Sequence, residues 1–156
     1  MKKLAAALEH KVPPPLIGAL CASLMWLICG MPPLTGRPPL LLVPALALVV
    51  LGLTVDAAGV LSFRRARTTV NPFAPERTVN IVSSGIYRLS RNPMYLGMAC
   101  ILTGWAVWLW QVQAVLGVGL FVAWITRFQI IPEERVLTQK FGTEYRQYRQ
   151  RVRRWV

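Results

Sequence analysis

Four apolar runs alternate with polar, proline-rich or charged segments along the chain, and each run predicts a helix. They cover residues 16–30, 40–63, 94–110 and 114–131. A helix of about 20 apolar residues crosses the roughly 30 Å hydrocarbon core of a bilayer, so the second run is long enough and the first is near the lower limit. The pattern predicts an all-α integral membrane protein with about four transmembrane helices, in one domain over 1–156.

The polar segments lie on either side of the last two runs. Only residues 111–113 separate those runs, which predicts an antiparallel helical hairpin and returns residues near 93 and near 131 to the same membrane face. A connection over 64–93 precedes the hairpin and a tail over 132–156 follows it. In the tail, Gly142 is expected to end one short helix, with Thr143 capping the next.

That next helix carries an apolar and aromatic stripe at spacings of 3, 4 and 3, made of Tyr145, Tyr148, Val152 and Trp155. Such a stripe predicts an amphipathic helix lying at the membrane surface. The fold class expected is therefore a helical membrane bundle with an amphipathic, cytoplasmic tail.

The distribution of basic residues predicts which segments of the chain face the cytoplasm. The net charge is +12, which in a soluble protein would suggest nucleic-acid binding. Here the basic residues flank apolar runs, so we expect no nucleic-acid partner and assign them to topology and anionic lipid. Lysines and arginines number three before the first run, one in the first loop, six in 64–93, none in 111–113 and seven from 132 onward. Both termini and the 64–93 connection should be cytoplasmic.

Few residues outside the hairpin suggest chemistry. The three cysteines fall inside apolar runs and the chain has one histidine, so no metal site or disulfide is expected. Asp56 lies within the second run, where a carboxylate is costly and is a functional candidate by default. The alternative is that Asp56 lies close enough to the interface to reach water or to pair with Arg64 or Arg65.

Two polar clusters flank the hairpin. In GIYRLSRNPMYLG, residues 85–97, Pro93 suits the first turn of a helix and Asn92 suits its N-cap. The start of that helix also presents free N–H groups to an anion. In the second cluster, Glu133 and Glu134 follow a proline, and acids at a helix start are favoured by the helix dipole whether or not they bind a ligand.

Together the two clusters resemble the isoprenylcysteine carboxyl methyltransferase family, which is related to the membrane phospholipid methyltransferases. The family pattern is G-x-Y-x-x-x-R-H-P-x-Y-x-G, then E-E-x-x-L, then F-G-x-x-Y-x-x-Y. The matching residues are Gly85, Tyr87, Arg91, Pro93, Tyr95, Gly97, Glu133, Glu134, Leu137, Phe141, Gly142, Tyr145 and Tyr148. The stretch TTVNPF, 68–73, is similar to bacterial members, and the resemblance therefore implies a bacterial inner membrane. Asn92 replaces the family histidine; it can exchange hydrogen bonds but cannot act as a base at neutral pH.

The resemblance implies that S-adenosylmethionine binds on the cytoplasmic side, between the two clusters and without a Rossmann domain. The cofactor-binding residues it implies are Tyr87, Asn92, Pro93, Tyr95, Gly97, Glu133, Glu134, Tyr145 and Tyr148. Catalytic roles are expected for Arg91, Glu134 and Arg153. The glutamates would bind the donor's ribose or amino group, the tyrosines its adenine or sulfonium, and the arginines its carboxylate or an acidic acceptor.

The methyl acceptor stays open. A prenylcysteine-like carboxylate, a small thiol and a lipid amine are all compatible with the sequence, and the oligomeric state is not readable from it. An alternative hypothesis is a non-catalytic small membrane protein whose basic tail binds anionic lipid or a membrane partner.

Overall fold

The computed structural model describes residues 9, 11–36, 38–66 and 80–156. Within them the chain forms helices and no strand, which confirms the all-α class. The elements are α2 (Pro14–Ile28), α3 (Pro39–Arg65), the 3-10 helix η2 (Gly85–Arg88), α4 (Pro93–Leu109), α5 (Ala114–Ile125), the π turn η3 (Thr126–Ile130), α6 (Ile131–Phe141) and α7 (Thr143–Arg151). The TTVNPF stretch at 68–73 lies outside the described residues.

Among the residues that the structure describes, two helices are long and apolar enough to cross a membrane, judged by length and composition. They are α3, over Pro39–Arg65, and a continuous helix over Ala114–Phe141 that joins α5, η3 and α6. The helices Pro14–Ile28 and Pro93–Leu109 are apolar but shorter. Four helices therefore correspond to the four predicted runs, and the number of membrane crossings stays a prediction.

The helix expected to start at Pro132 corresponds to α6, which continues from α5 and η3 through Pro132 without a break. The π turn Thr126–Ile130 lies directly before this proline. A π turn interrupts the regular i→i−4 hydrogen-bond ladder, so a residue without an N–H donor is tolerated next to it. As a result Glu133 and Glu134 lie on the same continuous helix as α5, which packs in the core.

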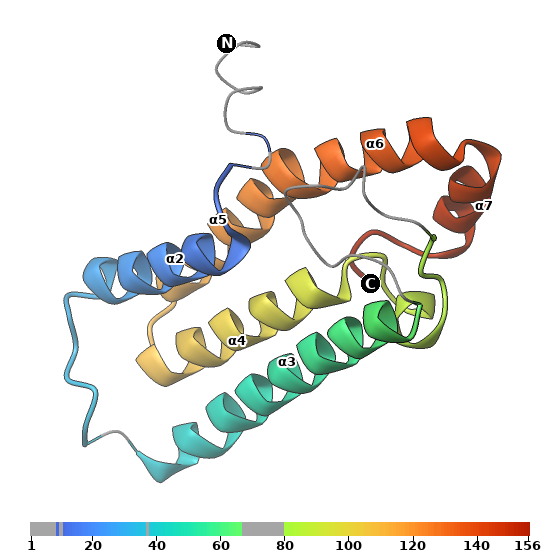
Figure 1. Ribbon diagram of the computed structural model, residues 1–156. Coiled ribbons are helices and arrows are strands. Elements are labelled where there is room, and N and C mark those ends of the chain that lie inside the picture. The colour runs from blue at the N-terminus through green and yellow to red at the C-terminus, as the bar shows by residue number, and fades with distance from the viewer. Residues whose placement is uncertain (1–8, 10, 37, 67–79) are drawn as a thin grey trace.

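Helices α3 and α4 run antiparallel and side by side (Figure 1). Small residues at intervals of seven make their contact close: Gly52 and Gly59 on α3, and Gly97 and Gly104 on α4. A Cβ atom added at Gly52 would lie 2.5 Å from the carbonyl oxygen of Gly97. Small residues allow helix backbones to approach in this way inside membranes.

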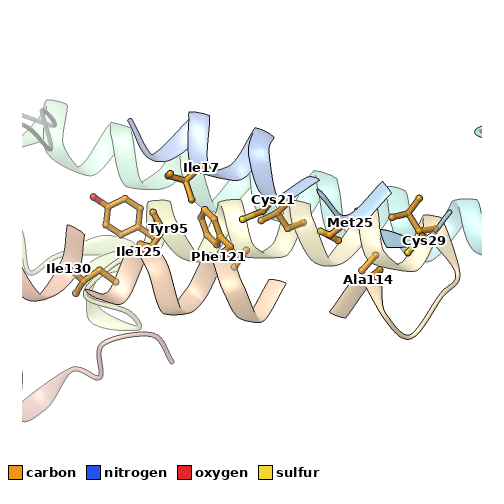
Figure 2. Packing of buried hydrophobic residues seen from close by; sticks show 13 residues of the cluster. Ile17, Cys21, Met25, Cys29, Tyr95, Ala114, Phe121, Ile125 and Ile130 are labelled. Carbon is orange, nitrogen blue, oxygen red and sulfur yellow. The ribbon is translucent and has the colours of Figure 1, made fainter. Parts of the chain in front are cut away.

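Helix α2 packs against α5 and α4 through one residue in every four. Figure 2 shows Ile17, Cys21, Met25 and Cys29 along this face of α2, with Phe121 opposite them on α5. Both cysteines are buried here and act as small apolar side chains. This core fixes α5, and through it the position of α6.

The predicted hairpin of α4 and α5 is confirmed. Helix α4 ends at Leu109, the next residue Trp110 has a left-handed backbone with φ of 53°, and α5 starts at Ala114. The two helices pack against each other. The N-terminal end of α4 therefore lies near the junction of η3 and α6, as the short turn requires.

The tail differs from its prediction at two points. Gly142, with φ of 54°, makes the turn between α6 and α7, but Thr143 forms no capping hydrogen bond and is the first helical residue. Helix α7 also stops at Arg151, and Val152 is extended. The expected stripe is therefore not helical beyond Tyr148, because residues 152–156 turn back toward the start of α4 as a segment we call the strap (Figure 1).

Candidate active site

The two sequence clusters meet where α4 begins and α6 passes. Tyr95, one turn into α4, donates a hydrogen bond of 2.7 Å from its hydroxyl to Glu133 Oε1 on α6. Tyr95 is buried. The hairpin produces this contact, because it brings the first turn of α4 next to the first turn of α6.

Three arginines surround the neighbouring carboxylate of Glu134, which is buried with 8% of its side chain exposed. Arg154 binds it in bidentate geometry, with Nε 3.0 Å from Oε1 and Nη2 2.8 Å from Oε2. Arg91 Nη1 lies 3.0 Å from Oε1, and Arg149 Nη2 lies 4.0 Å from Oε2. Three guanidinium groups around one carboxylate leave an excess of positive charge.

Arg91 is not fully satisfied by this arrangement. Its side chain is 8% exposed, yet its Nε and Nη1 have no hydrogen-bond partner within the described residues. Nη1 is close to Glu134, but as an ion pair without hydrogen-bond geometry. Because a buried donor without a partner is costly, Arg91 is suited to receive a further anion.

The strap is held against the first cluster by its backbone. The Arg91 amide donates to the carbonyl of Arg153 at 3.1 Å. Asn92 Nδ2 and Ser90 Oγ donate to the carbonyl of Arg154 at 2.9 and 3.4 Å. Asn92 occupies the N-cap position of α4, as predicted, but its side chain forms no capping bond, because its amide is directed to the strap.

Three tyrosines, Tyr87, Tyr145 and Tyr148, lie on the side of the site next to η2. The Tyr148 hydroxyl donates to the Tyr87 carbonyl at 2.7 Å, and the Tyr87 ring packs edge-on against Phe63 at 5.3 Å. Burial, followed by the negative charge of Glu134, raises the pKa of Tyr145 to about 12. Burial also raises the pKa of Tyr148 and of Tyr87. These phenols are therefore neutral near pH 7 and offer aromatic faces and hydroxyl groups.

The remaining predicted residues are placed differently. Pro93 is buried at the start of α4. Gly97 faces α3, where its Cα lies against Gly52 and a side chain would overlap the Asp56 carboxylate, so its visible role is helix packing. The Arg153 side chain is exposed and forms no ion pair among the described residues. Its neighbour Arg154, which was not among the predicted residues, pairs with Glu134 instead.

The sequence held no clear signal for Arg154. It is one of four arginines within residues 149–154, and a helix was expected to continue through all of them. In a helix, Arg153 and Arg154 would differ only in the face they occupy. The extended backbone from Val152 onward decides which one reaches Glu134, and the hydrogen bonds to Glu134 raise the pKa of the Arg154 guanidinium.

Asp56 lies on α3 beside Gly97. Its Oδ1 is buried without a hydrogen-bond partner among the described residues, and neither Arg64 nor Arg65, both described, forms an ion pair with it. The pairing considered as an alternative is therefore absent from this structure. No group of three or more candidate metal ligands occurs in the described part of the chain.

Comparison with known proteins identifies the family. The sequence model of the phospholipid methyltransferase family matches residues 40–144, and the chain belongs to this family. The match covers α3, η2, the hairpin of α4 and α5, and α6, and it ends before Tyr145, Tyr148 and Arg154, which also line the site.

Individual relatives agree with this assignment. The probable protein-S-isoprenylcysteine O-methyltransferase of Oryza sativa subsp. indica is 32% identical over 108 residues, which are 69% of this chain and 56% of that protein. Protein-S-isoprenylcysteine O-methyltransferase A of Arabidopsis thaliana is 30% identical over 69% of this chain and 54% of its own length.

An uncharacterized protein of Haemophilus influenzae is 51% identical over 63 residues, its whole length and 40% of this chain. The chain spans about half the length of the plant relatives it matches. No solved structure matches it.

Proposed function

We propose that this protein is a membrane methyltransferase that uses S-adenosylmethionine as methyl donor. The observation that carries the proposal is the meeting of the two clusters, in which Tyr95 bonds to Glu133 and Arg91 pairs with Glu134. Membership of the phospholipid methyltransferase family supports the reaction class. The proposal includes four membrane-spanning helices with the site at the cytoplasmic face.

The residues present fit the chemistry of this donor. The donor carries a carboxylate, and Arg91 has buried N–H groups without a partner. It carries a cationic centre and a flat adenine ring, and the rings of Tyr145 and Tyr148 lie 6.1 Å apart beside the cluster. It carries ribose hydroxyls and an amino group, for which Glu133 is the acidic acceptor.

When bound, S-adenosylmethionine supplies a methyl group on a sulfonium. The chain's own task is then to orient the reactants and to keep water out, because an ionised carboxylate or thiolate acceptor needs no base near neutral pH. Arg91 would hold an anionic group, Glu133 would accept hydrogen bonds, and the neutral tyrosines would supply aromatic contacts. Asn92 donates to a backbone carbonyl here, so proton transfer is not assigned to it. A lipophilic acceptor would enter from the bilayer between helices.

Calorimetric titration with S-adenosylhomocysteine tests the proposal on the full chain in detergent. We expect micromolar binding that weakens about tenfold or more in Glu133→Gln, which loses the acidic acceptor, and in Tyr95→Phe, which loses the hydrogen bond that orients this carboxylate. Glu144→Gln is the matched control, because Glu144 is exposed on α7 and should bind like the wild type.

A folded wild-type protein that binds no S-adenosylhomocysteine would refute the proposal. Equal weakening in Glu144→Gln would also refute the assignment of the site. In the first case, binding of the protein's basic α7 to anionic vesicles would support the non-catalytic alternative.

A further inference from the structure

Asn92 stands where the family pattern has histidine, and the structure shows what its side chain does. The amide donates at 2.9 Å to the carbonyl of Arg154, in the strap. Ser90 supports the same carbonyl at 3.4 Å and also accepts a hydrogen bond from the Asn92 backbone at 3.1 Å. The side chain of Asn92 therefore acts on the strap.

The strap is fixed on both sides of Arg154. Before it, the Arg153 carbonyl accepts from the Arg91 amide. After it, the Trp155 indole donates to Thr126 Oγ1 at 3.2 Å, and the Trp155 ring packs on the apolar core. Arg154 is thus presented to Glu134 by a segment that is anchored at each end, and its bidentate geometry follows from that anchoring.

The bidentate contact determines what Arg91 is free to do. Glu134 has two oxygens, and Arg154 takes one hydrogen-bonding direction on each. Arg91 is held close to Oε1 at 3.0 Å but without hydrogen-bond geometry, so Nε and Nη1 remain available. Without Arg154, Glu134 would be the nearest acceptor for those buried N–H groups, and a carboxylate forms a bidentate pair with one guanidinium readily. The free N–H groups of Arg91 would then bind Glu134 and would not be available to a ligand.

We propose that Asn92 and Arg154 are positioning residues that keep Arg91 free to bind the carboxylate of the methyl donor. The inference rests on the proposed function and adds to it separate roles for three residues. Arg154 neutralises Glu134, Arg91 faces the ligand, and Asn92 sets the strap in place through one hydrogen bond. The histidine of the family pattern could fill the position of Asn92, because an imidazole N–H is also a donor.

The test compares two ligands that differ in one group. S-adenosylhomocysteine has the carboxylate, and its decarboxylated analogue keeps the amino group and the adenosine but lacks it. The ratio of the two dissociation constants, measured by calorimetry on the full chain, reports how well Arg91 binds the carboxylate. We expect wild-type protein to prefer S-adenosylhomocysteine by about tenfold or more, the effect of one charge-assisted hydrogen bond.

Arg154→Gln should reduce this ratio to near one while leaving the affinity for the decarboxylated analogue unchanged. Asn92→Asp should reduce it as well, because a carboxylate of the same shape cannot donate to the Arg154 carbonyl and repels it. Asn92→His should retain the preference. Arg151→Gln, which removes an exposed arginine at the end of α7, should match the wild type. Using two variants keeps the test decisive if Arg154→Gln does not fold.

Three results would overturn the inference, and they are distinguishable. If the wild type binds neither ligand, the proposed function fails as well. If the wild type prefers S-adenosylhomocysteine and both variants keep the preference, only the positioning role fails. If the variants lose affinity for both ligands equally, Arg154 and Asn92 are structural and Arg91 does not depend on them.

Discussion

The contact between α3 and α4 at Gly52 leaves no room for a side chain, which makes Gly52→Ala a direct test of the helix pairing. The new Cβ atom would lie 2.5 Å from the Gly97 carbonyl oxygen and 2.7 Å from Ile101 Cγ1. To reach an ordinary contact of 3.4 Å, the two backbones would have to separate by about 0.9 Å. Overpacking of this kind costs roughly 1–3 kcal/mol.

Thermal unfolding in detergent, followed by tryptophan fluorescence, measures that cost. For a chain of this size each 1 kcal/mol lowers the Tm by roughly 2–4 °C, so Gly52→Ala should melt about 2–12 °C below a Gly→Ala variant that makes no such contact. Gly119→Ala is the matched control, because a Cβ there meets no atom within 4 Å. Alanine also favours a helix over glycine by roughly 1 kcal/mol, so Gly119→Ala should melt at or above the wild-type temperature.

Since both variants make the same substitution inside a helix, the difference between their Tm values isolates the contact with α4. Equal Tm values for Gly52→Ala and Gly119→Ala would show that α3 and α4 are not packed backbone to backbone. The register of Asp56 against Gly97 would then also be wrong.

Of two further substitutions, one is expected to lower the stability strongly and the other only slightly. Met25→Ala removes a fully buried side chain that fills the space beside Gly117, so unfolding should become easier by about 2–5 kcal/mol; a Tm drop under about 4 °C would contradict the packing of α2. Glu9→Gln breaks ion pairs of 3.2 and 3.3 Å to two exposed arginines, and such surface pairs contribute at most about 1 kcal/mol. Its Tm should stay within about 4 °C of wild type, and a larger drop would mean that Glu9 anchors the start of α2.

The apolar runs in the sequence predicted most of the helices. Their limits agree with α2, α3, α4 and the start of α5 within about two residues, because proline and glycine mark the ends. The hairpin was readable from the length of its turn alone. The continuity of α5, η3 and α6 through Pro132 was not predicted, since a pattern of residues does not show a π turn that makes a proline acceptable inside a helix.

The site was readable only in part, and the reason is similar. Glu133, Glu134, Tyr95 and Arg91 come together because rigid helices and a short turn leave them no alternative. The contacts of Arg154 depend on an extended strap, whose path is set by distant backbone hydrogen bonds. No local pattern around residue 154 distinguishes it from the arginines beside it.

The continuous helix Ala114–Phe141 has a consequence for the depth of the site in a bilayer. Its 28 residues measure about 42 Å at 1.5 Å per residue, against a hydrocarbon core of about 30 Å. If Ala114 lies at the membrane interface away from the site, about 20 residues cross the hydrocarbon core. The helix then leaves the core close to Glu133 and Glu134. Hydrophobic mismatch would therefore act directly on these carboxylates: a thicker membrane draws them toward the acyl chains, and a thinner one lifts them into the headgroups. If the helix spans a bilayer as proposed, membrane thickness would change the hydration of Glu133 and Glu134.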